Sequence, residues 1–567
     1  MIKSEFGEFL KWLKNQYPTT PTVYDLVVPS SAELFSESIN KVQLLKFFSD
    51  FELITATDQP LSSLPSSFLY GGEPSWPDIH QHVDIERKDN EKISQKLLET
   101  ALGNVKDRFI LVLDEAGTGK TTTIKRIAHN LAQSGNPVLS LRTLSRINTD
   151  AAIACLACAK TNILLVIDHL ADHIDQLMQI LDNKVVAEKV IILAAERSYR
   201  KEYLDIVRGE HPIAEIKLLP MQRSVILQLI ERYNKYGLVA NARAVKKSSD
   251  FANQLLNDPI AISVCRILND FQPIAKIIDS LWDATKPTDR LPYLCVALAQ
   301  HCYGAGFRYS LLQNILGPNI SVSRFINSKL PLMLGINSIE EEFLVTANQV
   351  IGERILNKVI FEDKELLYET FRSLATVIAP HVNRKAVMKR TPEARLAGRL
   401  FDSDKIVRPF LGNESAEKFY NVIQSRWQWN SRYWEQRALL AADNDLHRAI
   451  QYARHAVANE RHPFPLTTLG KILLMNMKNQ SANRNKLFSD AFMALNEAIE
   501  MEASNYRISA HPYATILSGT VNYLDLGGEL TISQKRKISE YRNEAAYRFR
   551  TDTTIATLAQ QLDSKLD

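Results

Sequence analysis

One glycine-rich run constrains the fold of this 567-residue chain more than any other feature. The run is Asp114-Glu115-Ala116-Gly117-Thr118-Gly119-Lys120-Thr121-Thr122; it follows the apolar segment Phe109–Leu113 and precedes a helix expected over Thr121–Leu131. A strand, a glycine-rich turn and a helix, in this order, are the context of a phosphate-binding loop. The chain is therefore expected to contain an α/β layer built around this loop.

The composition of the run explains how it would hold a nucleotide. Glycines let the backbone N–H groups of residues 117–120 surround the β-phosphate, and the helix that follows adds a favourable dipole. The Lys120 ammonium is expected to bridge the β- and γ-phosphates, and the Thr121 hydroxyl to ligate Mg²⁺. Eight consecutive residues are expected to contact the nucleotide: Glu115, Ala116, Gly117, Thr118, Gly119, Lys120, Thr121 and Thr122.

Asp114 departs from the usual pattern, which begins with glycine. That first glycine serves the turn from strand to loop more than it serves the phosphate. We therefore expect nucleotide binding to survive the exchange.

A second apolar segment, Ile163–Ile167, ends in Asp168 and His169. A strand that ends in aspartate at this distance after a P-loop is typical of a Walker B strand, in which Asp168 would hold Mg²⁺ through water. His169 stands where many hydrolysing proteins have a second acid, so it is either a catalytic group or a surface residue at a strand end. Glu115 is another conceivable acid, and the assignment of the hydrolytic base stays open.

A third apolar segment begins at Val190 and ends in Glu196 and Arg197. An arginine beside the Walker B strand is placed to reach a γ-phosphate and to sense its presence. The alternative is a solvated arginine at a strand end. We count Lys120, Asp168, His169 and Arg197 as the candidate catalytic residues.

Short apolar segments alternate with helical ones from Lys106 to about residue 222, which predicts a parallel, doubly wound sheet in a P-loop NTPase core. Strands are expected at Phe109–Leu113, Pro137–Leu141, Ile163–Ile167, Val190–Leu193 and Ile216–Leu219. After Pro220 helical periodicity takes over, with mostly helical units expected over 223–270, 271–382 and 383–567. In the last unit, small residues at helical spacing suggest closely packed helix pairs of a tetratricopeptide-like array: Ala449, Ala453, Ala456, Ala491, Ala494 and Ala498.

Composition bears on nucleic-acid binding, on the chemistry of the cysteines and on the location of the protein. The net charge of +4 comes with no run of Lys and Arg comparable to a basic arm, so nucleic acid is neither implied nor excluded. The five cysteines form no disulfide framework, and Cys155 and Cys158 are expected to be a buried structural pair rather than a zinc or redox site. No secretory signal and no apolar run of membrane-spanning length occur, so a cytoplasmic location without membrane contact is expected.

The region before the core is expected to have two parts. Residues 1–58 are interpreted as a small unit with a strand at Thr22–Val28 and a helix that starts near Ser36. Residues 59–105 are interpreted as a linker, richest in proline and serine over Gln59–Pro77, and a charged lead-in helix over Arg87–Leu102.

Four features together resemble the STAND class of P-loop ATPases, signalling relatives of AAA+ proteins that include NACHT modules. They are residues 117–122, the strand ending in Asp168, the strand ending in Arg197, and the segment Leu255–Ala261 with Asn257-Asp258-Pro259. The resemblance covers about residues 70–380. Residues 68–76 and the helix beginning at Tyr433 also look like parts of large bacterial STAND proteins, many of which act in anti-phage defence.

The resemblance implies roles for the flanking units. Residues 223–270 would be a helical lid in which Pro259 lies near the adenine, and 271–382 a winged-helix-like domain. The class often has a histidine there that contacts the β-phosphate, but this chain has Thr346-Ala347-Asn348-Gln349 near the expected place. Residues 1–58 would be an effector remnant or adaptor, and 383–567 a helical sensor.

The function that this resemblance implies is a switch operated by ATP, ADP and Mg²⁺. A ligand or trigger protein on the C-terminal helices would open the protein. The open protein would form a homo-oligomer and activate an effector, either in this chain or as a separate protein. Slow hydrolysis would reset it. Two alternative functions stay open. An AAA+-like motor or remodeller would require a second acid after Asp168, and a STAND transcription regulator would require a DNA-binding unit.

Overall fold

The computed structural model describes most of the chain. The described residues are 34–35, 39–55, 67–101, 108–142, 147–204, 207, 211–239, 248–326, 328–334, 342–505, 508–550 and 552–566. The strand expected at Thr22–Val28 lies outside them. No helix in the described part is long and apolar enough to cross a membrane.

A six-stranded sheet forms the centre of the N-terminal half, with order β1-β3-β4-β5-β2-β6. Its strands are β1 (Phe51–Leu53), β2 (Phe109–Asp114), β3 (Val138–Leu141), β4 (Ile163–Ile167), β5 (Val190–Arg197) and β6 (Ile213–Ile216). All neighbours pair in parallel except β1, which is antiparallel to β3. β5 therefore lies between the strand before the glycine-rich loop and the strand that ends at Asp168, and the parallel α/β fold expected for this region is confirmed.

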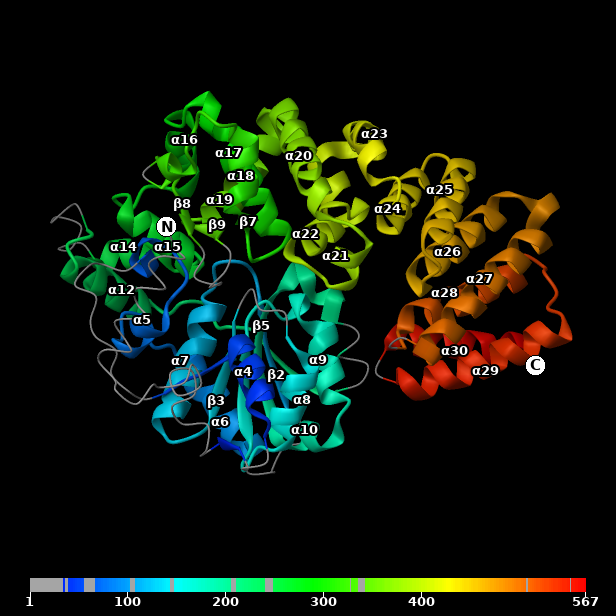
Figure 1. Ribbon diagram of the computed structural model, residues 1–567, viewed down its shortest axis with the longest axis horizontal. Coiled ribbons are helices and arrows are strands. Elements are labelled where there is room, and N and C mark those ends of the chain that lie inside the picture. Colours follow the sequence, from blue (N-terminus) through cyan, green and yellow to red (C-terminus); the bar gives the residue numbers. More distant parts are fainter. Residues whose placement is uncertain are drawn as a thin grey trace.

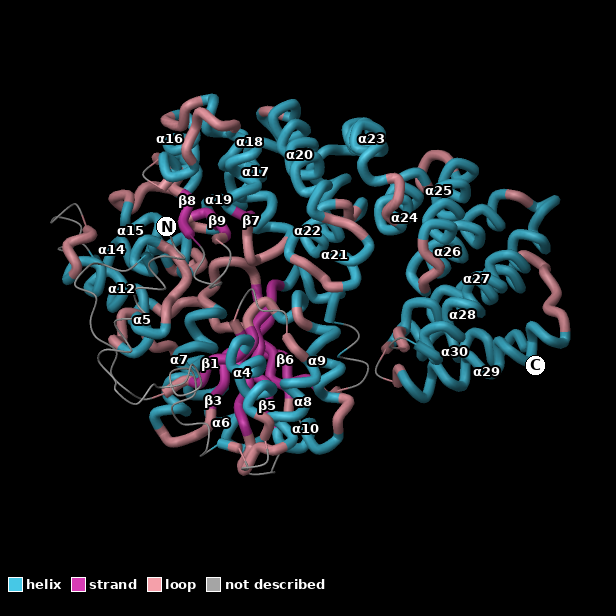
Figure 2. Tube along the Cα trace, in the orientation of Figure 1, coloured by secondary structure: helices cyan, strands magenta, loops and turns pink. Residues whose placement is uncertain are grey.

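Alternation along the strands explains why helices cover both faces of the sheet. In β2, Ile110 and Val112 pack on one face with α6 (Lys88–Ala101) and α7 (Lys120–Gln133). Phe109 and Leu111 point to the other face, which is covered by α4 (Lys41–Asp50), α8 (Thr149–Ala157), α9 (Ile174–Leu181) and α10 (Lys184–Lys189). Figure 2 shows the strands enclosed between these helices. A sheet buried on both faces requires the nearly continuous apolar strands that the sequence has.

The structure differs from the expected segment boundaries at the N-terminal side of the core. β1 lies within the segment expected to be a separate N-terminal unit, yet Phe51 pairs with Leu141 of β3 as an edge strand of the core sheet. The expected helix near Ser36 begins at Lys41 instead, where Asn40 caps it, and it packs on α8. β6 ends at Ile216, three residues earlier than expected.

Residues 67–90, expected to be mostly linker, are folded onto the helix that follows the loop. They contain η1 (Ser67–Tyr70) and α5 (Trp76–His80), whose start is fixed by a capping box between Ser75 and Asp78. The Asp84 carboxylate pairs with Arg126 of α7, and both side chains are fully buried. Lys125 donates to the Pro74 carbonyl at 2.8 Å. Two adjacent residues of α7 therefore hold this segment against the core.

Beyond the sheet the chain is mostly helical (Figure 1). α12 (Arg223–Lys235), α14 (Ser248–Leu255) and α15 (Ile260–Leu268) share an apolar core with residues 69–85. A three-stranded antiparallel sheet, β7-β9-β8, follows among helices. Its elements are α16 (Ile274–Asp283), α17 (Pro287–Cys302), β7 (Phe307–Arg308), α18 (Tyr309–Leu316), β8 (Leu332–Leu334), β9 (Phe343–Thr346), α19 (Gln349–Glu362) and α20 (Lys364–Ile378).

The remaining helices run from beside the core sheet to an arm that extends away from it (Figure 1). They are α21 (Arg384–Met388), α22 (Pro392–Leu400), η6 (Ser403–Val407), α23 (Arg408–Trp427), α24 (Ser431–Ala441), α25 (Leu446–Asn459), α26 (Pro463–Asn479), α27 (Arg484–Asn505), α28 (Ala510–Asp525), α29 (Ile532–Arg548) and α30 (Thr553–Leu566). The six alanines singled out in the sequence are all buried in this arm. Gly470 lies so close to Leu495 that any added side chain would collide with it. Small residues thus allow close helix packing, whereas a true repeat stays a prediction.

Breaking the Arg126–Asp84 pair should destabilise the core. Arg126→Met leaves a buried carboxylate without its partner, which costs about 3–5 kcal/mol of unfolding free energy. Urea unfolding of the full chain, followed by intrinsic fluorescence, measures the loss. The control is the double variant Arg126→Met/Asp84→Leu, which removes both charges and should recover much of the stability. A double variant as unstable as the single one would contradict the role given to the pair.

Candidate nucleotide-binding site

The loop between β2 and α7 has the backbone that a phosphate cradle needs. Gly117 and Gly119 adopt φ of 75° and 92°, values that favour glycine, and Gly119 caps α7. The Ala261 N–H donates to the Gly117 carbonyl at 3.0 Å, and an added side chain at Gly117 would collide with Val350 and press on Ala261. The loop is therefore held from outside by the start of α15 and the start of α19.

The Asp114 carboxylate, at the position where the motif usually has glycine, stabilises the turn through two hydrogen bonds. It accepts hydrogen bonds from the Glu115 N–H at 2.8 Å and from the Leu218 N–H at 3.2 Å. The side chain is 4% exposed. It thereby joins the end of β2 to the segment that follows β6. Neither hydrogen bond involves the N–H groups of residues 117–120, which are the ones expected to surround the phosphate.

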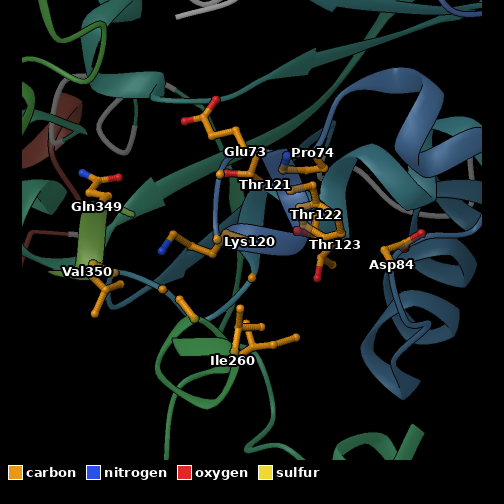
Figure 3. A pocket seen from close by; sticks show the side chains of 18 of the residues that line it. Glu73, Pro74, Asp84, Lys120, Thr121, Thr122, Thr123, Ile260, Gln349 and Val350 are labelled. Carbon is orange, nitrogen blue, oxygen red and sulfur yellow. The ribbon is translucent and has the colours of Figure 1, made fainter. Parts of the chain in front are cut away.

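A cavity opens over this loop, with a polar and an apolar end. The polar end contains Lys120, Thr121, Asp168, His169 and Arg197, so all four candidate catalytic residues line one space. The apolar end is lined by Phe68, Leu69, Val83, Ile85, Leu229, Tyr233, Ile260 and Val264. Figure 3 shows Lys120 pointing to the side of Gln349 and Val350, with Ile260 on another wall. Phosphates and a flat apolar base would fit opposite ends of such a cavity.

The Lys120 side chain spans the loop. Its ammonium donates to the Glu115 carbonyl at 2.5 Å. Burial, followed by the neighbouring Arg197, lowers the pKa of Lys120. A phosphate group entering the cavity would compensate both effects, because it offers the lysine a charged acceptor.

Thr121 and Asp168 form the oxygen pair expected for Mg²⁺. The Thr121 hydroxyl lies beside the Asp168 carboxylate, which accepts a hydrogen bond from the His169 N–H at 2.8 Å. Burial alone would raise the pKa of Asp168, but His169 and Thr121 outweigh it, so the pKa is lowered. An ionised carboxylate beside a hydroxyl is a donor set that suits this hard cation.

His169 is buried in the site rather than lying on the surface, so the interpretation as a surface residue is wrong. It is 6% exposed, has φ of 50°, and packs against Gly304. Its Nε2 lies 3.7 Å from Oε1 of Glu73. Burial alone would lower the pKa of His169, but Asp168 and Glu73 outweigh this effect and raise it.

Arg197 is buried too, so the alternative of a solvated arginine is wrong. It is 5% exposed and lies opposite Asp114 in the register of β5 and β2. Its guanidinium donates to the Tyr199 hydroxyl at 2.8 Å and to Oε1 of Glu353 at 3.3 Å. The same carboxylate oxygen accepts from Gln349 at 3.4 Å and lies 3.9 Å from the His301 ring. An arginine at the phosphate end is thus tied to helix α19.

Several expected contacts lie elsewhere. The Glu115 side chain is exposed, and Thr118 and Pro259 are not among the cavity-lining residues. Pro259 caps α15, and its neighbours Ile260 and Ala261 line the cavity instead. At the place where the class often has histidine, Asn348 and Gln349 line it. The segment is therefore near the site, with amides in place of imidazole.

Sequence reasoning missed the contribution of residues 68–90, which line the cavity with Glu73, Asp84, Arg87 and Asn90. Arg87 donates to the Thr118 carbonyl at 2.8 Å and pairs with Asp89, which accepts from the Leu219 N–H. A proline-rich stretch carries no periodicity that would reveal such contacts. The available signal was the capping box Ser75-x-x-Asp78, which indicates an ordered helix start inside the supposed linker.

Cys155 is buried as expected, whereas Cys158 is half-buried, and neither residue lines this site. Burial, together with the neighbouring Cys158, raises the pKa of the Cys155 thiol to about 12. Nowhere in the described ranges do three or more His, Cys, Asp or Glu side chains form a metal-binding group.

A glycine-rich loop between strand and helix, an aspartate facing its threonine, and an interposed strand ending in arginine define a P-loop NTPase module. Residues 66–204 match the family Novel STAND NTPase 5, which supports a STAND-class NTPase module in this range. The matched range begins in the segment before α5 and ends just beyond Arg197. The match to an NTPase family implies nucleotide hydrolysis and suggests nucleotide binding, both in general terms. No curated protein is significantly similar to the chain.

Restoring the usual glycine should harm this loop. Asp114→Gly leaves the buried N–H of Leu218 without its acceptor, at about 1–3 kcal/mol, and the partly buried N–H of Glu115 at a smaller cost. We expect a lower melting temperature in calorimetry, with Asp114→Asn less affected because it retains one acceptor oxygen. Equal stability of Asp114→Gly and the wild type would show that the carboxylate does not support the turn.

Proposed function

We propose that this protein is a signalling switch whose state is set by ATP or ADP with Mg²⁺. The observation that carries this proposal is the ion pair between Arg197 and Glu353. It joins the phosphate end of the site to helix α19, which belongs to the region proposed as a winged-helix-like domain. A γ-phosphate near Arg197 would compete with Glu353 for the same guanidinium.

The contacts around the cavity support the interpretation that the described structure is the closed state of the proposed switch. Asn348 and Val350 approach the site from the start of α19: an added side chain on Gly71 would collide with Asn348, and one on Gly117 with Val350. A helix seated this closely on the loop would restrict nucleotide exchange. Release of α19 is therefore proposed as the opening step.

A second set of contacts supports the same closed state. Arg390 of the α21–α22 turn pairs with Asp175 of α9, and the Arg399 guanidinium lies over the Tyr203 ring, 3.3 Å from its centroid. Lys405 lies over the same ring at 4.5 Å. These contacts are charged or partly exposed, and such contacts separate at lower cost than an apolar interface.

The proposed cycle follows from these two interfaces. A ligand or trigger protein on the helices after residue 383 would favour the separated state, in which ATP replaces ADP. The exposed NTPase modules would form a homo-oligomer and activate an effector, either the region before residue 59 or a separate protein. A role in anti-phage defence is proposed on the resemblance alone.

Residues 223–270 are the proposed lid of the nucleotide site, and the apolar end of the cavity would bind the adenine.

The rival functions have less support. A motor would turn over continuously, and the residue after Asp168 is His169 rather than an acid. A transcription regulator needs a DNA-binding unit, and no basic recognition helix is identified in the C-terminal region.

Hydrolysis kinetics separate the switch from the motor. We expect ADP or ATP to co-purify with the protein and steady-state turnover to stay well below about one per minute, since typical motors and enzymes turn over near 10 s⁻¹. Lys120→Ala should bind little nucleotide, because it removes the phosphate cation. Fast continuous hydrolysis that Lys120→Ala abolishes would favour the motor instead.

Loss of the Glu353 charge should shift nucleotide preference. Glu353→Gln weakens the hold on Arg197, so affinity for ATP relative to ADP should rise about fivefold or more, within the range of ordinary coupling energies. Titration with fluorescent ATP and ADP measures the ratio, and light scattering follows oligomer formation. Glu362→Gln, an exposed acid on the same helix paired with Lys358, is the matched control. An unchanged ratio of ATP affinity to ADP affinity in Glu353→Gln would contradict the role proposed for the ion pair between Arg197 and Glu353.

A further inference from the structure

We propose that Glu73, which precedes the P-loop by about 40 residues, is the general base that activates water for hydrolysis. This inference rests on the proposed nucleotide site and names a residue for its chemistry. It fills the gap left after Asp168, where His169 stands in place of an acid.

Four carboxylates line the cavity in the described part of the chain: Glu73, Asp84, Asp168 and Glu196. Three of them are already engaged. Asp84 is paired with Arg126, and Asp168 accepts from the His169 N–H at 2.8 Å and lies beside Thr121. Glu196 accepts from the N–H groups of Ala171 and Arg197 at 2.8 and 2.7 Å, and it lies 3.6 Å from the Arg200 guanidinium. Each of these three carboxylates thus accepts at least one hydrogen bond from the protein.

Glu73 differs from these three in both exposure and partner. Its side chain is 46% exposed, and it faces the His169 ring across 3.7 Å. A carboxylate open to the cavity can hold a water molecule, and one locked between amides and guanidinium groups cannot. In Figure 3 Glu73 is drawn beside Thr121, and the contacts of His169 with Glu73 and of Asp168 with Thr121 agree with this placement.

The backbone around Glu73 is fixed on both sides. Gly71 has φ of 93° and lies against Asn348, and Gly72 lies so close to the Ser67 carbonyl that a side chain would press on it. On the other side, the Pro74 carbonyl accepts from Lys125 of α7. Glu73 is thus attached to the helix that carries Thr121, and its position relative to the phosphates is set by that helix.

The proposed step is hydrolysis of the γ-phosphate by water. The water oxygen forms a bond to the γ-phosphorus while the bond from that phosphorus to the β-γ bridging oxygen breaks, and the electron pair leaves with ADP. The water proton passes to the Glu73 carboxylate and then to solvent or phosphate. Lys120 and Mg²⁺ would stabilise the charge on the leaving oxygens.

Glu73→Gln tests the inference because glutamine keeps the shape and removes the proton acceptor. The full chain is loaded with ATP, and the rate of a single turnover is compared with binding of fluorescent ATP. General-base catalysis contributes about 10²–10⁴-fold, so the rate should fall about a hundredfold or more while affinity stays within about twofold. Glu73→Asp, which keeps a carboxylate on a shorter stem, should retain an intermediate rate.

The matched control is Glu91→Gln, an exposed acid on α6, which should behave as wild type. A single-turnover rate of Glu73→Gln within about threefold of wild type overturns the inference. Loss of nucleotide binding in Glu73→Gln overturns it too, because Glu73 would then act on binding. The proposed switch fails separately, through fast steady-state turnover of the wild type, whatever Glu73→Gln does.

Discussion

The buried pair of Arg126 and Asp84 is the contact on which the rest of the site depends. Arg126 belongs to the helix that begins at the P-loop, and Asp84 belongs to the segment that supplies one wall of the cavity. A charge pair without water tolerates little displacement, since each group depends on the other for compensation. Because of it, an irregular, proline-containing segment can hold Glu73 at the phosphate end and Leu69, Val83 and Ile85 at the apolar end.

In the proposed switch, electrostatics inside the cavity would decide which state is favoured. Lys120 bonds to a carbonyl of its own loop, and Arg197 bonds to a carboxylate of α19. Both cations are buried, so each needs an acceptor, and the protein supplies one. A triphosphate would replace both acceptors at once. Binding of phosphate and loosening of α19 would then be two descriptions of one exchange of partners.

Much of the α/β core could be predicted from the sequence, because a strand buried on both faces must be apolar and a P-loop allows few residues. Lys120, Thr121, Asp168 and Arg197 do converge in the structure. The parts that could not be predicted depend on tertiary contacts: β1 pairs with β3 across nearly ninety residues, and the segment around Glu73 acquires its position from α7. Pro259 lies just before the cavity-lining residues Ile260 and Ala261, since a proline that caps a helix leaves the contacts to the residues after it.

The carboxylate at position 114 has a further consequence for how such chains are recognised. It makes two hydrogen bonds, one within the loop and one to Leu218, about a hundred residues later. A pattern search that insists on glycine at the start of the motif would pass over this protein. Proteins with the same exchange should reveal themselves through a pair of positions that vary together: an acid at the end of the P-loop strand, and a non-proline residue just past the last strand of the core, since only an N–H can meet that acid.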